Sequence, residues 1–158
     1  MPTPTLDAID KRILDNLQRA GRLTNLELAD RIGLSPSPCL RRVRMLETED
    51  VIEGYGARLN RENVGLGLMA FIGVNVEGHG DAGATFRAAV TQMPEVVACY
   101  IVSGDDDFLL QVVVPSLADY RAFTLDRLLK VPGIKNIRSS FVIDTVKENA
   151  PLPLAHLR

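Results

Sequence analysis

The stretch GLSPSPCLRRVRMLE, residues 33–47, decides the fold of the first part of the chain. Gly33 can adopt the left-handed backbone that ends a helix, so one helix is expected to stop there. Ser35 then precedes Pro36, and proline is favoured at the first position of a helix because its missing N–H has no helical partner there. A new helix is therefore expected from residue 36. Apolar residues at helical spacing predict its inner face: Leu40, Val43 and Leu46.

The residues before this stretch predict two more helices. Apolar residues recur at helical spacing between Leu6 and Leu17, and Gly21 follows as an end signal. Residues 24–27 have the pattern of a capping box, in which the threonine and glutamate side chains bind unpaired backbone N–H groups. Three short helices, the last two joined tightly, give the outline of a helix-turn-helix. Such helices also occur in proteins without a nucleic-acid role, so the outline alone leaves DNA binding open.

The pattern changes near residue 50, where the apolar period shortens from that of a helix to that of a strand. A strand is expected at 51–59 and a linker at 60–67. The expected elements after the linker are strands at 68–77, 96–103, 108–114 and 134–145, helices around 86–93 and 117–128, and a loop with Gly78, Gly80 and Gly83. We therefore divide the chain into residues 1–50, a linker strand and hinge at 51–67, and a second domain at 68–158.

The order of these elements, βαββαβ, contains two similar halves. Pro94 and Pro132 each end a helix, and a strand follows each of them. Two such halves predict a ferredoxin-like sandwich, with one antiparallel sheet and both helices on one face, in a chain of the α+β class. Apolar runs such as 112–114 indicate that the second face is also covered, and oligomerisation through the sheet is the simplest way to cover it.

The charge of the whole chain argues against nucleic acid, but the charge of the predicted third helix does not. The chain has 18 basic and 20 acidic residues and a formal net charge of −2. Residues 35–46 hold three arginines and no acidic residue. With the inner face centred on Val43, Arg41 points outward, and Arg42 and Arg44 flank the exposed side. Arginine can bind guanine with both arms or clamp a phosphate, although an exposed basic helix can also be merely a solvated face. The expected DNA-contacting residues are Thr24, Asn25, Ser35, Ser37, Pro38, Arg41, Arg42, Arg44 and Met45. Cys39, at the inner edge, is interpreted as a packing residue.

A second polar feature is the loop Ser103-Gly104-Asp105-Asp106-Asp107, between two predicted strands. Glycine and aspartate are common in solvated turns for backbone reasons alone. The carboxylates could also bind an α-ammonium group while backbone N–H groups near Gly104 bind the α-carboxylate. A divalent metal is a third interpretation, although the loop lacks the spacing of an EF-hand. All three interpretations stay open at this point.

The motifs together resemble those of the Lrp/AsnC (feast/famine) transcription regulators, most of all the leucine-responsive branch. The resemblance covers nearly the whole chain in order. It rests on the opening helix (Leu6, Asp7, Asp10, Ile13 and Leu14), residues 21–28, residues 33–47, the loop 102–110, Val131-Pro132-Gly133 and the tail Val146-Lys147-Glu148.

The resemblance implies an N-terminal winged-helix-like helix-turn-helix and a C-terminal ferredoxin-like domain that senses a small effector. It also implies homodimers formed through the sheets, often assembled as four dimers into an octamer, with an amino-acid effector bound between dimers. Carried over by position, the effector residues are Ser103, Gly104, Asp105, Asp106 and Asp107, with Ser139 and Ser140 on the last strand. Asp106 replaces the aromatic that the family usually has, and a carboxylate there suits a polar or cationic partner.

Several function classes find no support in the sequence. There is no nucleophile–base pair, phosphate-cradling loop or metal-ligand set, so no enzyme activity, cofactor or metal is expected. The start lacks a secretory pattern and no apolar run is long enough for a membrane span, so we expect a cytoplasmic protein. The leading hypothesis is a sequence-specific, effector-responsive transcription regulator. The alternative is a sensor or assembly module that does not bind DNA.

Overall fold

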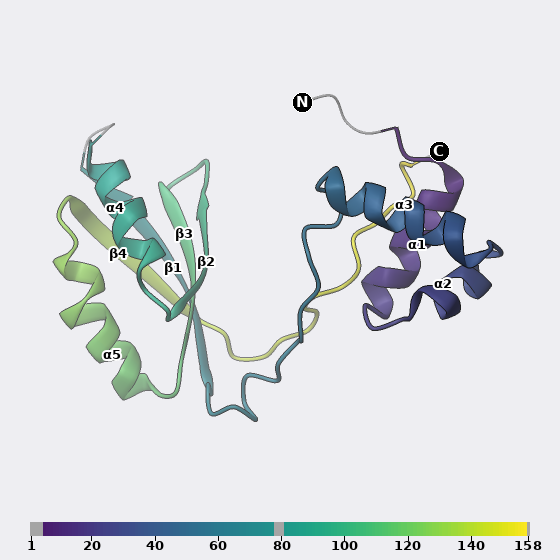
Figure 1. The fold of residues 1–158 in the computed structure, drawn as a ribbon. Coiled ribbons are helices and arrows are strands. Elements are labelled where there is room, and N and C mark those ends of the chain that lie inside the picture. The colour runs from purple at the N-terminus through teal and green to yellow at the C-terminus, as the bar shows by residue number, and fades with distance from the viewer. Residues whose placement is uncertain (1–4, 78–80, 158) are drawn as a thin grey trace. The chain divides into compact units, whose positions relative to one another are not determined.

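Three helices form the first unit within residues 5–77 and 81–157, the part of the chain that this computed structural model describes (Figure 1). They are α1 (Ala8–Arg19), α2 (Asn25–Ile32) and α3 (Pro36–Thr48). The helices meet over a core of buried side chains that includes Ile13, Leu28 and Leu46. The predicted helix-turn-helix is therefore confirmed.

The start of α2 follows its predicted cap, whereas the start of α3 does not. Thr24 accepts the N–H of Glu27, and the Glu27 carboxylate accepts the N–H of Thr24 at 2.7 Å. Gly33 ends α2 in the left-handed region, with φ of 70°. Ser35 holds the cap position of α3, but its hydroxyl makes no capping bond to any described residue. The reason is that Pro38, at the third helical position, lacks one of the N–H donors that a capping hydroxyl accepts.

The strand expected at 51–59 is not formed. The N–H groups of Val51 and Ile52 instead bind the carbonyl oxygen of Leu46, at 2.9 and 3.0 Å, and so complete the end of α3. The residues that follow, up to residue 59, pair with no other strand in the described part of the chain. A strand needs a neighbour to complete its backbone hydrogen bonds, and the chain supplies none here.

The second unit is an antiparallel sheet covered by two helices on one face (Figure 1). Its elements are β1 (Leu68–Val76), α4 (Asp81–Thr91), β2 (Val96–Ile101), β3 (Phe108–Val114), α5 (Leu117–Asp126), a short 3-10 turn (Leu128–Lys130) and β4 (Ile134–Phe141). The strand order β2-β3-β1-β4 confirms the predicted ferredoxin-like sandwich. Gly78 and Gly80 of the expected glycine-rich loop lie outside the described residues, and Gly83 lies in α4.

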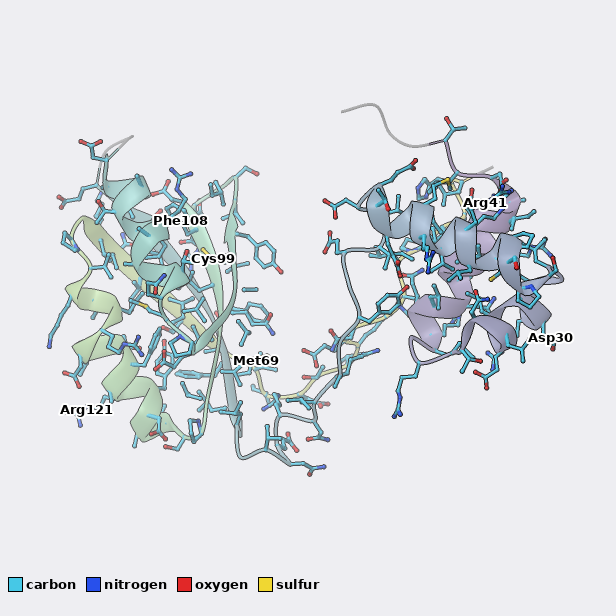
Figure 2. All side chains as sticks on the ribbon, in the orientation of Figure 1. Asp30, Arg41, Met69, Cys99, Phe108 and Arg121 are labelled. Atoms are coloured by element: carbon cyan, nitrogen blue, oxygen red, sulfur yellow. The ribbon has the colours of Figure 1, made fainter. Side chains whose placement is uncertain are left out.

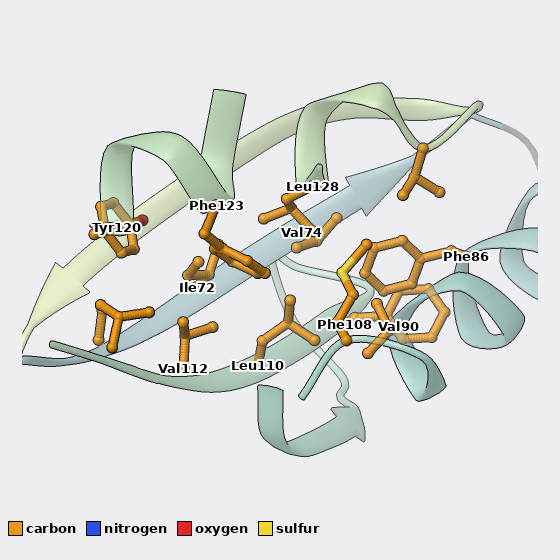
Figure 3. Close-up of a cluster of buried hydrophobic side chains, with 14 residues drawn as sticks. Ile72, Val74, Phe86, Val90, Phe108, Leu110, Val112, Tyr120, Phe123 and Leu128 are labelled. Atoms are coloured by element: carbon orange, nitrogen blue, oxygen red, sulfur yellow. The ribbon is translucent and has the colours of Figure 1, made fainter. Parts of the chain in front are cut away.

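The core of this unit lies between the sheet and the two helices (Figure 3). Phe86 of α4 packs against Phe108 of β3 with ring centroids 4.7 Å apart. Alternate residues of β1, such as Ile72 and Val74, point into this core. The residues between them, such as Phe71 and Gly73, therefore lie on the opposite face, which we call the open face of the sheet.

The C-terminal tail belongs to the first unit rather than to the second. The two units are Met1–Arg58 with Lys147–Arg158, and Leu59–Val146. The side chain of Gln18 on α1 accepts the N–H of Leu152 at 2.6 Å and donates to its carbonyl at 3.4 Å. Leu154 and Leu157 pack against the helical core. From the sequence we assigned all of residues 68–158 to one domain, because no local pattern in the tail shows which core its leucines pack against.

Candidate functional sites

The outer face of α3 carries a stripe of polar and basic side chains. Ser37, Arg41, Arg44 and Thr48 follow one another at helical spacing, and all four are exposed. Arg41 is labelled on α3 in Figure 2. Neither Arg41 nor Arg44 has an ion-pair partner within the described part of the chain. Both guanidinium groups are therefore available to an anionic partner.

Helix α3 is rotated about its axis relative to the predicted orientation, in which the inner face was centred on Val43. Cys39 and Leu46 are fully buried, whereas Leu40, expected on the inner face, is 38% exposed. At 100° per residue, the midpoint between Cys39 and Leu46 lies about 50° from Val43. The rotation moves Arg44 outward to join Arg41. Cys39 is the packing residue that was expected, and burial raises the pKa of its thiol.

The same rotation moves Arg42 toward the core, where it pairs with Asp7, the residue that caps α1, and with Asp10 in the first turn of α1. Its Nη1 donates to Asp7 Oδ2 and to Asp10 Oδ1, each at 2.8 Å. The Asp10 side chain is only 3% exposed. The hydrogen bonds to Asp10, and then to Asp7, raise the pKa of Arg42. The hydrogen bond from the Asp10 backbone, together with Arg42, lowers the pKa of Asp7. The sequence pattern predicts, in contrast, that Arg42 flanks the exposed surface.

The other predicted DNA-contacting residues lie around the two helix starts. Thr24 is engaged in the cap of α2, and the Asn25 amide donates to the Pro36 carbonyl at 2.8 Å. That bond links the start of α2 to the start of α3. Ser35 is exposed, Pro38 is half-buried, and Met45 is 37% exposed beside the stripe.

The three aspartates of the loop between β2 and β3 differ in what they contact. Asp105 is exposed, and its carboxylate has no partner among the residues described. Asp106 accepts a hydrogen bond from Arg138 Nη2 at 2.7 Å. Asp107 accepts the N–H of Val76 at 3.0 Å and donates its own N–H to the Val74 carbonyl at 3.1 Å. Asp107 therefore fixes the loop to β1, and of the three only Asp105 keeps an uncommitted carboxylate.

The Asp106 carboxylate lies directly over Gly73, on the open face of the sheet. A Cβ atom added to Gly73 would come within 2.2 Å of Asp106 Oδ2, so a larger residue here would displace the Asp106 carboxylate from this position. Arg138 is the direct register partner of Gly73 on β4. These three residues thus form one local arrangement, in which Arg138 neutralises the charge of Asp106.

Ser139 and Ser140 lie on opposite faces of the sheet. Ser139 pairs in register with Ile72, and its hydroxyl forms a hydrogen bond with the Tyr120 hydroxyl of α5. Ser140 pairs with Phe71 and lies on the open face. Ser140 therefore shares a face with Asp106, and Ser139 belongs to the layer between sheet and helices.

Two residues next to the predicted sites were missed by the sequence analysis. Arg138 lies two residues before Ser140, and alternation along a strand puts both on one face, so this signal was present. Gly73 gave no signal, because its role depends on the register between β1 and the loop.

No helix in residues 5–77 and 81–157 is long and apolar enough to cross a membrane. Over the same residues, no cluster of three or more His, Cys, Asp or Glu is placed to hold a metal ion.

Comparison with known proteins agrees with both units. Residues 6–53 match a winged helix-turn-helix DNA-binding family, and residues 69–152 match the Lrp/AsnC ligand binding domain. The leucine-responsive regulatory protein of Salmonella typhimurium is 42% identical over 149 residues, covering 94% of this chain and 91% of that protein. The protein of the same name from Escherichia coli K12 is 41% identical over the same shares.

Solved structures match nearly the whole chain. A transcriptional regulator from Neisseria meningitidis, determined as a complex with L-Met, superposes with a TM-score of 0.94 at 45% identity, covering 98% of this chain and all of that one. An AsnC family regulator from Agrobacterium tumefaciens gives 0.90 at 34% identity, covering 97% of this chain and all of that one. The chain therefore belongs to the Lrp/AsnC family of transcriptional regulators, which join a DNA-binding helix-turn-helix to an amino-acid-binding domain.

Proposed function

We propose that α3 reads duplex DNA through the stripe formed by Ser37, Arg41, Arg44 and Thr48. The observation that carries this proposal is the pair of exposed guanidinium groups on one face of the second helix of a helix-turn-helix. Such a helix enters the major groove, where arginine binds guanine O6 and N7 or an adjacent phosphate. The rest of the proposed interface lies beside the stripe and at the helix starts: Thr24, Asn25, Ser35, Pro38 and Met45. Arg42 is not part of this proposed interface, because its guanidinium group is held by Asp7 and Asp10.

The second part of the proposal is an amino-acid effector bound at the loop 103–107. The Asp105 carboxylate accepts hydrogen bonds from the α-ammonium group, and the backbone N–H groups around Gly104 donate to the α-carboxylate. Gly104 has φ of 125°, a conformation that favours glycine. Ser103 and Ser140 add neutral hydrogen bonds. The remaining predicted residues position the site: Asp106 through Arg138, Asp107 through β1, and Ser139 through Tyr120.

The proposed effector is an apolar amino acid, with leucine and methionine as the first candidates. Asp106 alone would favour a cationic side chain, but its pairing with Arg138 removes that preference. The names of the relatives support the choice, since one group is called leucine-responsive and one similar structure holds L-Met.

The proposed assembly is a homodimer formed through the open face of the sheet, with further association into an octamer. Phe71 and Leu109 lie on this face, and Tyr100, which pairs in register with Leu109, is 56% exposed. Covering such a face removes apolar surface from water. We further propose a cytoplasmic location, as a DNA target requires, and no catalytic activity, in line with relatives named as regulators.

A thermal-shift screen against the twenty amino acids tests the effector proposal. A ligand that binds only the native state stabilises it by about 2.7 kcal/mol at a hundredfold excess over Kd. We expect leucine or methionine to raise the melting temperature, and Asp105→Asn to abolish that rise. Asp30→Asn, an exposed change on α2, is the matched control and should keep it. A flat result across all twenty amino acids contradicts amino-acid sensing.

The alternative function is a sensor that does not bind DNA. The exposed arginine stripe argues against it, because Arg41 and Arg44 have no ion-pair partner among the described residues and their guanidinium groups can bind phosphate. Salt separates the two functions, since neutralising phosphates makes DNA affinity fall steeply as salt rises. A chain that shows no salt-dependent binding to duplex DNA would be the sensor alone.

A further inference from the structure

Asp7 and Asp10 divide their carboxylate oxygens between the start of α1 and Arg42. Asp7 Oδ1 accepts the N–H groups of Ile9 and Asp10, at 2.8 and 2.9 Å. Asp10 Oδ2 accepts the N–H of Asp7 at 3.1 Å. The other oxygen of each carboxylate accepts from Arg42 Nη1. The arginine is therefore held by the first backbone turn of α1, and not merely by two flexible side chains.

This arrangement is a poor site for a phosphate group. Two carboxylates surround one guanidinium, so the cluster carries a formal charge of −1. The Arg42 side chain is 26% exposed, and its Nη1 already makes two bonds. A phosphate could bind only through the remaining N–H groups of the guanidinium or by displacing an aspartate, and in either case it would approach a net negative charge. Arg41 and Arg44, the neighbours on the outer stripe, present no such obstacle.

We propose that Arg42 is a positioning residue, which fixes the rotation of α3 about its axis and does not contact DNA. The clamp of Asp7, Asp10 and Arg42 holds one side of α3 against α1. Because successive residues are 100° apart, fixing Arg42 on the inner side directs Arg41 and Arg44 outward. The proposal rests on the use of α3 as the reading helix.

The test compares Arg42→Ala and Asp10→Asn with Arg44→Ala, the matched control on the same helix. Affinity is measured over a range of salt for two probes: a duplex selected by the parent protein from a random pool, and a mixed-sequence duplex of equal length. Thermal midpoints are measured in parallel, and binding is measured well below them.

Loss of the clamp should lower affinity for the selected duplex without removing a phosphate contact. We expect Arg42→Ala and Asp10→Asn each to weaken that affinity about tenfold, the value of one good base contact, and to reduce its ratio to the mixed-sequence duplex. The slope of log K against log salt should stay at the parent value. Both variants should lower the thermal midpoint by about 5 °C or more. Arg44→Ala should keep the midpoint and reduce the salt slope by about 1.

Opposite results would overturn the proposal. If Arg42 binds phosphate, Arg42→Ala reduces the salt slope by about 1, and Asp10→Asn frees the arginine and strengthens binding. If the clamp only stabilises the fold, the midpoints fall but the affinity ratio of the folded protein stays unchanged. Asp7→Asn, at a half-exposed position, is a milder variant that can be used if the others fail to fold. Its salt slope and its ratio of affinities for the two duplexes then test the proposal in the same way.

A parent protein that binds neither duplex would contradict DNA reading rather than the clamp. The contact between Arg42 and Asp10 is then tested by thermal midpoints alone. The double variant Asp10→Asn with Arg42→Ala should lose less than the sum of the two single changes, because both break the same contact. Additive losses would show that the two residues do not act together.

Discussion

Arg41 and Arg42 are adjacent in the sequence but differ in every contact. One helical step of 100° separates an exposed guanidinium from one held by two carboxylates. We expect Arg41→Ala to weaken binding to a selected duplex by about 1–3 kcal/mol, or roughly 5- to 150-fold, by fluorescence anisotropy. Its thermal midpoint should match the parent. Arg12→Ala, an exposed arginine on α1, is the control, and equal affinity of parent and Arg41→Ala would exclude Arg41 from the interface.

Tyr55 is a second residue whose surroundings alter its chemistry. Its hydroxyl donates to Glu47 Oε1 at 3.0 Å, and burial together with this carboxylate raises its pKa to about 12. The folded protein therefore holds the phenol proton more tightly than the unfolded chain does, where the pKa is about 10. The stabilisation is complete below about pH 10 and is lost as the pH rises toward 12.

Absorbance titration of the phenol measures this effect. The difference between the parent and Tyr55→Phe isolates one of the three tyrosines. We expect its ionisation near pH 12, and at a lower pH in Glu47→Gln, whereas Glu49→Gln should leave it in place. Ionisation at the ordinary value of about 10, while circular dichroism still reports a folded chain, would contradict the contact with Glu47.

The caps of α2 and α3 have similar residues but different hydrogen bonds, so replacing them should affect stability differently. Thr24→Ala removes a hydroxyl that accepts a backbone N–H, so we expect a loss of about 1 kcal/mol in urea unfolding. Ser35→Ala removes a hydroxyl with no capping bond among the described residues and should cost close to nothing. Equal losses for the two variants would show that Ser35 does cap α3 in solution.

The sequence predicted the elements well where the signal was local. The capping box, the glycine stop of α2 and the order of strands and helices all depend on residues a few positions apart. The rotation of α3 could not be predicted from the sequence, because Cys39 and Leu40 are both apolar and either could face the core. Alternation puts Ser139 and Ser140 on opposite faces, but which of them faces the helices depends on how the sheet packs, and the clamp of Arg42 depends on residues more than thirty positions away.

At the scale of the whole molecule, the chain passes between its two units twice, after residue 58 and after residue 146. The tail brings Leu154 and Leu157 to the helical core, and Lys11 Nζ donates to the Leu157 carbonyl at 3.3 Å. Removing residues 147–158 should therefore destabilise the helical unit by about 1–3 kcal/mol, since the two leucines are half-buried.

Hydrogen exchange reports this loss separately for each unit. We expect faster exchange of α1 amides in the truncated chain, with β1 and β3 amides unchanged. Ala155→Ser, an exposed change within the same tail, is the control and should behave like the parent. Unchanged protection of α1 after truncation would mean that the tail contributes nothing to the helical core.

We propose that amino-acid binding and DNA binding are coupled within one chain. The most direct measurement is the affinity of the parent protein for its selected duplex, with and without the amino acid that raises its melting temperature. Linkage requires that an effector which changes DNA affinity has its own affinity changed by DNA to the same factor. We predict salt-dependent binding whose affinity shifts about 5- to 150-fold with the amino acid, a typical range for coupling between two sites. Identical affinities with and without the amino acid, or no binding to the duplex at all, would show that the two binding events are not coupled in this protein.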